Sequence, residues 1–242
     1  MTGVKGLLAR CLLLSALAAL GLQAVACGCG GKKDETGGPL PPAADVLAKA
    51  VERAATMKTF HFRLEHENGV TSIPLGLGLS TAEGDVIVPD RMQAKLEAKA
   101  GTQPVRVEVI GIGEEAWMTN PFNRQWQPLP SGNTIRDVFD PTQGIKAVAN
   151  ALENAEVTAE EEVGGVATYR VEGTVDSAIL EAAAPIAEPG LTVKVKVWIG
   201  KDDSLIRRVR LEGPIAPDEP PNIVRKLDVS KFDEPVSIEP PV

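Results

Sequence analysis

Apolar residues recur along this chain first at helical spacing and then at every second position. Between residues 43 and 57 they return every three or four residues, which predicts an amphipathic helix. From residue 60 onward the period changes to two, because Phe60, Phe62 and Leu64 alternate with polar neighbours. Such alternation is typical of a strand with one face buried and the other in water. The pattern predicts one helix followed by a strand-rich region.

Residues 91–99 show how propensity and period compete. They consist mainly of strong helix formers, yet apolar and polar residues alternate strictly from Met92 to Ala98. Helix propensities of ordinary residues differ by less than about 1 kcal/mol, whereas the period decides which side chains can be buried together. We therefore predict a strand here, and the same alternation predicts the next strand at residues 105–109.

Two further helices and several further strands follow. Asp140 and Pro141 are typical of a helix start, and the apolar residues from Ile145 to Leu152 share one face of that helix. A shorter helix is predicted from Asp176 to Ala184. Hairpin turns are predicted at residues 120–121 and 201–204, and strands at residues 155–162, 166–173, 192–199, 205–212 and 223–232.

About ten strands joined mostly by turns predict an α+β fold, an antiparallel sheet with helices on one face. A sheet of this length curls, and the space between a curled sheet and its helices suits an apolar ligand. Candidate residues for the wall of this cavity come from the apolar strand faces: Met92, Leu96, Val107, Val109, Val195 and Val197.

Residues 69–80 fit neither pattern. They contain too much glycine for a strong core strand and too many apolar residues for an ordinary surface loop. Two interpretations stay open. The segment is either a loop folded over the core or a mobile flap at a cavity mouth or at the membrane surface.

The residues offer no catalytic or metal-binding set. His61 and His66 are five positions apart in a strand, so they point to opposite faces and cannot share a metal ion. Gly111 and Gly113 lack the third glycine of a dinucleotide-binding loop, and neither a Gly-x-Ser-x-Gly elbow nor a Walker loop occurs. We predict a protein that is not an enzyme and that needs no metal and no cofactor.

The N-terminus is typical of a secretory signal. Residues 1–26 contain two cations, no acidic residue and an apolar run that is shorter than the roughly 20 residues needed to span a bilayer. The small residues before Cys27 resemble the bacterial lipobox, in which cleavage leaves an N-terminal cysteine that receives diacylglycerol. Cys29 is a second candidate. The alternative is an ordinary cleavage site beside a Cys-x-Cys pair, but that spacing disfavours a disulfide and no later cysteine completes a zinc site.

These features divide the chain into a signal peptide at residues 1–26, a lipidated cysteine and flexible tether at 27–42, and one domain at 43–242. The whole chain carries a net charge of −8, and removal of the cationic signal makes the mature protein more negative. A nucleic acid is excluded as a partner, because its phosphates require a positive surface.

Five short motifs occur in order along the predicted domain. Together they resemble the LppX/LprAFG family of bacterial lipoproteins. The motifs are Ala82-Glu-Gly-Asp-Val-Ile-Val-Pro-Asp-Arg91, Val107-Glu-Val-Ile-Gly-Ile-Gly113, Met118-Thr-Asn-Pro121 with Trp126, Trp198-Ile-Gly-Lys-Asp-Asp203 with Leu205-Ile-Arg-Arg208, and Ser230-Lys-Phe-Asp-Glu-Pro-Val-Ser-Ile-Glu-Pro-Pro241.

The resemblance implies a strongly bent antiparallel half-barrel with helices packed in its concave side, enclosing a large hydrophobic cavity. It also implies carriage of multiply acylated lipids or lipoglycans between the cell membrane and the outer envelope. The architecture is more distantly similar to the periplasmic carriers of the LolA and LolB type.

We therefore predict a lipoprotein held on the extracytoplasmic side of the cell membrane by a lipid on Cys27. It binds an acylated lipid or lipoglycan in its cavity and carries it across the envelope, with an envelope transporter as a candidate partner. The alternative is a scaffold or transporter-partner module with the same fold and a filled core.

Overall fold

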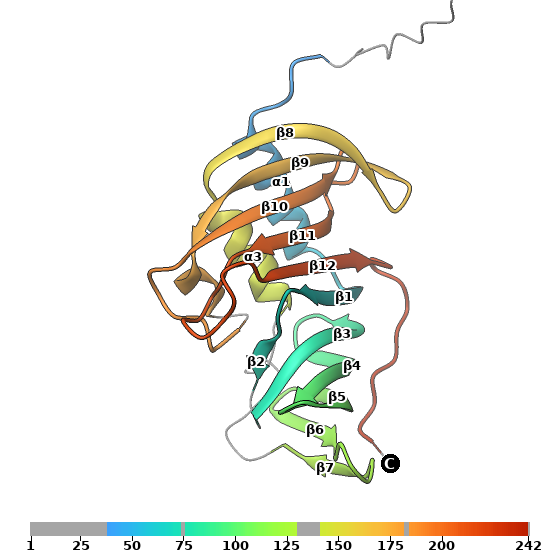
Figure 1. Ribbon diagram of the computed structural model, residues 1–242. Helices are drawn as coiled ribbons and strands as arrows, with labels where there is room; N and C mark the ends of the chain where they lie inside the picture. Colours follow the sequence, from blue (N-terminus) through green and yellow to red (C-terminus); the bar gives the residue numbers. More distant parts are fainter. Residues whose placement is uncertain (1–37, 74–75, 130–140, 182–183, 242) are drawn as a thin grey trace, which may run out of the picture. The chain divides into compact units, whose positions relative to one another are not determined.

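One antiparallel sheet of twelve strands dominates the structure, a computed structural model (Figure 1). It describes residues 38–241 except 74–75, 130–140 and 182–183. The predicted signal peptide, Cys27, Cys29 and the N-cap Asp140 lie outside the described residues. The strands are β1 (Thr59–Glu67), β2 (Thr71–Ile73), β3 (Leu77–Ile87), β4 (Arg91–Ala100), β5 (Gln103–Ile112), β6 (Glu115–Thr119), β7 (Trp126–Pro128), β8 (Glu153–Val163), β9 (Val166–Asp176), β10 (Thr192–Gly200), β11 (Ile206–Glu212) and β12 (Val224–Ser230).

The sheet consists of two runs of sequential hairpins that meet at one long-range pair. Its order is β7-β6-β5-β4-β3-β1-β12-β11-β10-β9-β8, and β2 pairs only with β3. The first and last strands of the chain, β1 and β12, join the two runs, with Leu64 opposite Leu227. β7 and β8 end the order, so the sheet is bent but not closed.

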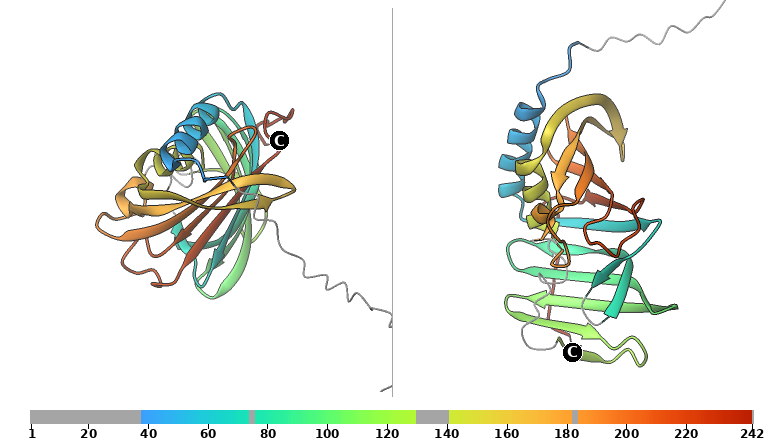
Figure 2. Two further views of the ribbon diagram at one scale, coloured as in Figure 1. Left: turned by 90° about the horizontal axis from the view of Figure 1, so that it is seen from above. Right: turned by 60° about the vertical axis from the view of Figure 1, so that its left-hand side comes forward.

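The helices cover the concave side of the sheet. α1 (Ala43–Ala55) contacts α3 (Pro141–Ala151), and Figure 2 shows both on the same side of the curved strands. α1 buries the apolar stripe that the sequence predicted, including Val46, Leu47 and Ala50. The predicted fold class, an α+β half-barrel with helices in its concave side, is confirmed.

The strand predicted against helix propensity is confirmed as β4. Met92, Ala94, Leu96 and Ala98 are all buried, while the residues between them are exposed or half-buried. Burial of one complete face outweighs the small propensity differences of the individual residues.

Residues 71–73 and 77–80 are paired strands, so the prediction of a loop over the core is wrong, whereas a mobile flap at a cavity mouth or at the membrane surface stays a prediction. They contribute β2 and the start of β3, paired from Thr71 opposite Leu79 to Ile73 opposite Leu77. The glycines of this segment are the reason that the sequence did not predict these strands, because glycine weakens strands in general. In β3, however, Gly84 lies opposite Phe62, and a Cβ on Gly84 would come within 2.0 Å of the carbonyl oxygen of Gln93.

The third helix predicted over residues 176–184 begins at Asp176 as expected, but its described turn is a 3₁₀ helix. β9 extends to Asp176, whose carboxylate then accepts a hydrogen bond from the backbone N–H of Ala178 at 2.8 Å. The 3₁₀ helix η2 (Ser177–Leu180) follows, and the backbone N–H of Ala184 donates to the carbonyl of Leu180 at 2.8 Å; residues 182–183 lie outside the described part of the chain. A helix this short gains little from alanine propensity, so the packing of buried Leu180 decides the local geometry.

Candidate ligand pocket

The strand register gathers apolar side chains on the inner face of the sheet. One row runs from β5 to β9 through directly paired residues, namely Val107, Leu96, Ala82, Leu64, Leu227, Val209, Val197 and Val171. Their neighbours along each strand point outward and are mostly charged. The inner face is therefore a continuous aliphatic surface that the helices must cover.

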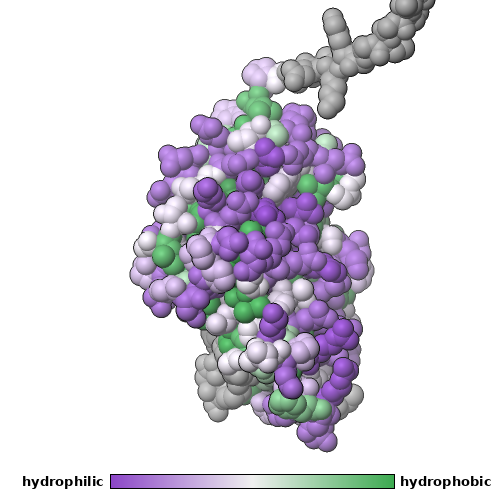
Figure 3. All heavy atoms as spheres, viewed as in Figure 1, coloured by the Kyte–Doolittle hydropathy of each residue, from purple (hydrophilic) through white to green (hydrophobic). Residues whose placement is uncertain are grey.

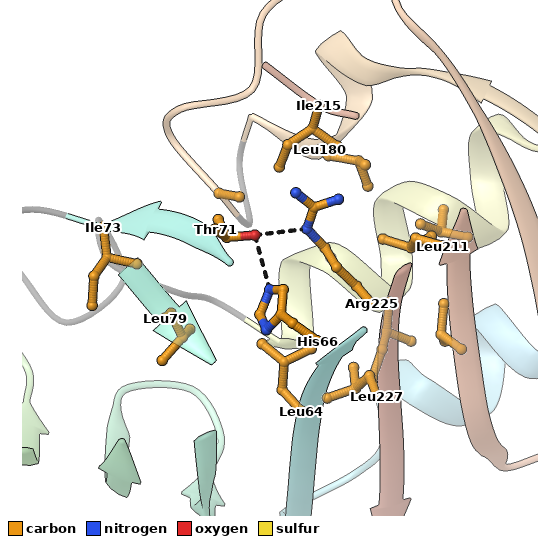
Figure 4. A pocket seen from close by; sticks show the side chains of 15 residues that line it. Leu64, His66, Thr71, Ile73, Leu79, Leu180, Leu211, Ile215, Arg225 and Leu227 are labelled. Atoms are coloured by element: carbon orange, nitrogen blue, oxygen red, sulfur yellow. Dashed lines mark hydrogen bonds between the residues drawn. The ribbon is translucent and has the colours of Figure 1, made fainter. Parts of the chain in front are cut away.

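A pocket lies between this surface and α3 (Figure 4). Leu64 and Leu227 form part of its floor, Ile145 and Val148 of α3 face them, and Ile73 of β2 borders it. The surface turned toward the cavity is entirely apolar, although His66, Thr71 and Arg225 belong to the wall. Water gains no hydrogen bond from such a surface, so an apolar group is the favoured occupant.

The cavity is small in this state of the protein. Its volume is about 80 Å³, whereas pockets for small molecules commonly measure roughly 300–1,000 Å³. A long acyl chain therefore requires the walls to move apart. Apart from the sheet, the walls are formed by α3 and by the segments that carry Leu180, Ala184 and Ile215.

The polar residues of the wall form a directed chain of hydrogen bonds. Arg225 Nε donates to Thr71 Oγ1 at 2.8 Å. The Thr71 hydroxyl can then donate to His66 Nε2, also at 2.8 Å, while His66 Nδ1 donates to the carbonyl of Ser80 at 3.0 Å. In this assignment the Thr71 hydroxyl accepts one hydrogen bond and donates another, while one nitrogen of His66 accepts and the other donates.

A buried ion pair completes the polar cluster. Arg225 pairs with Glu219, and their side chains are only 7% and 4% exposed. Arg225 also donates to the carbonyl of Gly213 at 3.2 Å, while Glu219 accepts from the backbone N–H of Ile215 at 2.8 Å. The charges are thus satisfied inside the wall, which leaves the cavity surface apolar.

His66 is uncharged at neutral pH. The pKa of His66 is lowered to about 4, mainly by burial, and the positive charge of Arg225 contributes to this shift. A neutral imidazole has one donor and one acceptor nitrogen, as the chain through Ser80 and Thr71 requires.

The six wall residues predicted from sequence are all buried on the inner face, but none of them lines this pocket. For two of them a paired neighbour lines it instead: Val209 lies opposite Val197, and Leu211 lies opposite Val195. Whether Met92, Leu96, Val107, Val109, Val195 and Val197 contact a ligand stays a prediction.

Sequence reasoning missed the buried polar cluster. It considered His66 only as a metal ligand, and it did not single out Thr71 or Arg225. A signal existed, since His66 and Arg225 occupy inward positions of strands whose other inward residues are apolar, and the two lie opposite each other in β1 and β12. The opposite orientation of His61 is confirmed, because its Nδ1 bonds Asp85 on the outer face at 2.8 Å.

No group of three or more His, Cys, Asp or Glu side chains in the described part of the chain could hold a metal ion. In the same residues, no helix is both long enough and apolar enough to cross a membrane.

A bent, open antiparallel sheet with helices over an apolar inner pocket defines the class of this protein, a half-barrel with an internal apolar site. The chain belongs to the LppX_LprAFG lipoprotein family, whose pattern it matches over residues 42–238. The family resemblance inferred from the five motifs is confirmed.

Relatives of known name match nearly the whole chain. The lipoarabinomannan carrier protein LprG of Mycobacterium tuberculosis is 27% identical over 243 residues, which cover 96% of this chain and 97% of the relative. LprG of Mycobacterium leprae is 21% identical and covers 90% of each chain. These relatives are named as carriers, which agrees with the prediction that the protein is not an enzyme.

Two crystal structures share the fold. LprF from Mycobacterium bovis has a TM-score of 0.64 at 18% identity, over 85% of this chain and 99% of its own. LppX from Mycobacterium tuberculosis has a TM-score of 0.60 at 18% identity, over 81% of this chain and 98% of its own.

Proposed function

We propose that this protein is a lipid carrier of the cell envelope. It is held on the extracytoplasmic side of the membrane by acyl chains on Cys27, with Cys29 as the other candidate for acylation. It takes the acyl chains of a lipid or lipoglycan into the pocket between α3 and the inner face of the sheet. The observation that supports this most directly is the wholly apolar surface of that pocket.

The driving force is burial of the acyl chain. Each methylene group transferred from water to an apolar wall contributes about 0.8 kcal/mol. Separation of α3 from the sheet opposes binding, because Ile145 and Val148 lose their present contacts. The carrier is passive in this mechanism, so the direction of transport comes from its partners, for which an envelope transporter is our candidate.

The opened cavity extends, in this proposal, along the aliphatic rows toward both ends of the sheet. Val195 and Val197 continue the row beside Val209 on one side. Leu96 and Val107 continue the row beside Leu64 on the other, with Met92 and Val109 in adjacent rows of the same face. The six residues chosen from sequence would then contact the bound chains.

Filling the pocket tests the proposal. In Val148→Phe, the added ring atoms occupy the cavity of about 80 Å³ that the valine now borders. We expect the variant to fold but to carry much less lipid when it is purified from its own host, extracted with organic solvent and analysed by mass spectrometry. Val166→Phe is the matched control, because Val166 is half-buried at the start of β9 and does not line the pocket.

A second function remains in competition because the cavity is so small. An 80 Å³ space is close to a filled core, as the envelope scaffold or transporter-partner module would have. Wild-type protein without stoichiometric lipid, or equal lipid content in Val148→Phe and wild type, would favour the scaffold and contradict the carrier.

A further inference from the structure

The outer face of the sheet carries a groove unrelated to the apolar pocket. It measures about 610 Å³, within the usual range for ligand sites, and lies over β1, β3, β4 and β5, with Trp126 of β7 at its side. A second hollow of about 580 Å³ adjoins it and shares Glu83, Lys95, Glu108 and Trp126. Trp126 therefore borders both hollows.

Charges alternate across the floor of the groove. Arg63, Glu83, Lys95 and Glu108 are directly paired in register from β1 to β5, so a cation always stands beside a carboxylate. Cross-strand neighbours lie about 5 Å apart, which spaces donors and acceptors at the scale of a sugar ring. Since neither sign dominates, the groove favours neither a polyanion nor a polycation.

The charged groups can exchange their partners for a ligand. Arg63 and Glu83 lie 3.2 Å apart and are each about half exposed. Arg106 and Glu97 lie 3.1 Å apart and are more exposed still. Exposed pairs of this kind contribute at most about 1 kcal/mol, so polar ligand groups can replace them at little cost.

Three further charged groups of the groove, Lys95, Glu108 and Arg124, lack such pairs. They form no ion pair with another residue in the described part of the chain, and all three are exposed. Hydroxyl groups, which both donate and accept hydrogen bonds, match this mixture of ammonium, guanidinium and carboxylate groups.

A hydrogen bond between β5 and β6 holds the floor of the groove beside Trp126. Thr119, opposite Trp126 in register, is buried, and its Oγ1 accepts a hydrogen bond from the backbone N–H of Glu108 at 2.8 Å. The indole is thus presented from a fixed hairpin, and it remains partly exposed. An indole offers a flat apolar face beside polar groups, on which the C–H face of a pyranose ring can lie.

We infer that this groove binds a neutral chain of hexose units, with Trp126 as the stacking platform and the charged rows as partners for the hydroxyl groups. The inference goes beyond the proposed lipid carriage, because the groove is on the face of the sheet opposite the pocket. The sugar can belong either to the head group of a glycolipid or to a free polysaccharide.

The test is a titration of the full-length protein, in a detergent without sugar groups, with maltohexaose, cellohexaose and mannohexaose. We expect at least one to change the tryptophan fluorescence and to bind with little dependence on salt. In Trp126→Ala, affinity should fall about tenfold or more.

Trp117→Ala is the matched control. Trp117 is equally half-buried on the same face of neighbouring β6, but it lines neither hollow. We expect its affinity to stay close to that of the wild type. Glu108→Gln, which replaces one acceptor on the floor, should weaken binding without affecting folding.

Three results would overturn the inference. They are the absence of binding for all three sugars, equal losses of affinity in the two tryptophan variants, and preferential binding of a sulfated saccharide that high salt abolishes.

Val148→Phe should bind the soluble sugar like the wild type, so a failure of lipid carriage and a failure of the sugar site are distinguishable. A lipoglycan whose binding falls in both Val148→Phe and Trp126→Ala would identify the head group as the source of the sugar, whereas an effect of Trp126→Ala on soluble sugars alone would identify a free polysaccharide.

Discussion

At the scale of single residues, the wall of the apolar pocket depends on polar groups that satisfy one another. Arg225 lies in β12 and bonds three other segments of the chain. Its partners are Thr71 of β2, the carbonyl of Gly213 after β11, and Glu219, which precedes β12. Removal of one member leaves another buried without a partner, which costs more than the bond itself contributes.

Arg225→Met tests this dependence. The variant leaves the 4%-exposed carboxylate of Glu219 without its cation, so we expect the free energy of unfolding to fall by about 3–5 kcal/mol. Arg106→Met removes an arginine from an exposed pair and should cost less than about 1 kcal/mol. Urea denaturation measures both losses of unfolding free energy. Equal losses would show that the buried pair stabilises the fold no more than the exposed pair does.

His66 should make stability depend on pH. Its pKa is lowered from 6.5 to about 4 in the folded protein, so the unfolded chain binds more protons between these values. Stability is therefore complete above pH 6.5 and is lost as the pH falls through about 4.

His66→Gln removes this proton linkage. We expect the difference in unfolding free energy between wild type and variant to change by up to about 3 kcal/mol across that window. Urea denaturation at a series of pH values measures it, and the acidic groups that also titrate are common to both proteins. Curves that stay parallel from neutral pH to pH 4 would contradict a buried, neutral His66.

At the scale of elements, Gly84 shows how a residue that weakens strands can be required in one. It lies between Phe62 of β1 and Ala94 of β4, and a Cβ there would meet backbone atoms on β4 at 2.0 and 2.7 Å. Backbone cannot give way as a flexible side chain can.

Gly84→Ala should therefore force β3 and β4 apart. We expect a loss of about 2 kcal/mol or more in unfolding free energy, in the range of a strained core substitution. Gly38→Ala is the control, because a Cβ there meets nothing within 4 Å. Thermal denaturation followed by circular dichroism distinguishes them, and an unchanged melting temperature in Gly84→Ala would show that the strands adapt.

The elements also show where sequence reasoning stops. Alternation predicted β4 against its propensity, because the burial of a whole face outweighs single-residue preferences. The same reasoning missed β2 and most of β3, where glycines interrupt the pattern, and it did not foresee that the helix after Asp176 starts as a 3₁₀ helix. Those segments take their shape from contacts with distant strands.

At the scale of the whole molecule, the two faces of the sheet have separate chemistry. The inner face is aliphatic and covered by α1 and α3, whereas the outer face carries rows of paired charges. The face turned to the viewer in Figure 3 is mostly hydrophilic, with only scattered apolar residues. Alternation along the strands produces this division, and it gives the two sides of one sheet different chemistry.

The sequence by itself determined which side chains share a face. The period of two assigns Leu96, Val107 and Val197 to the buried side regardless of the neighbouring strands, and the motifs identified the family. Only the tertiary structure decided which strands meet. The β1–β12 pair places His66 beside Arg225 and Leu64 beside Leu227, and α3 then closes a pocket over them. Pairing between the ends of the domain depends on long-range packing, which no local pattern encodes.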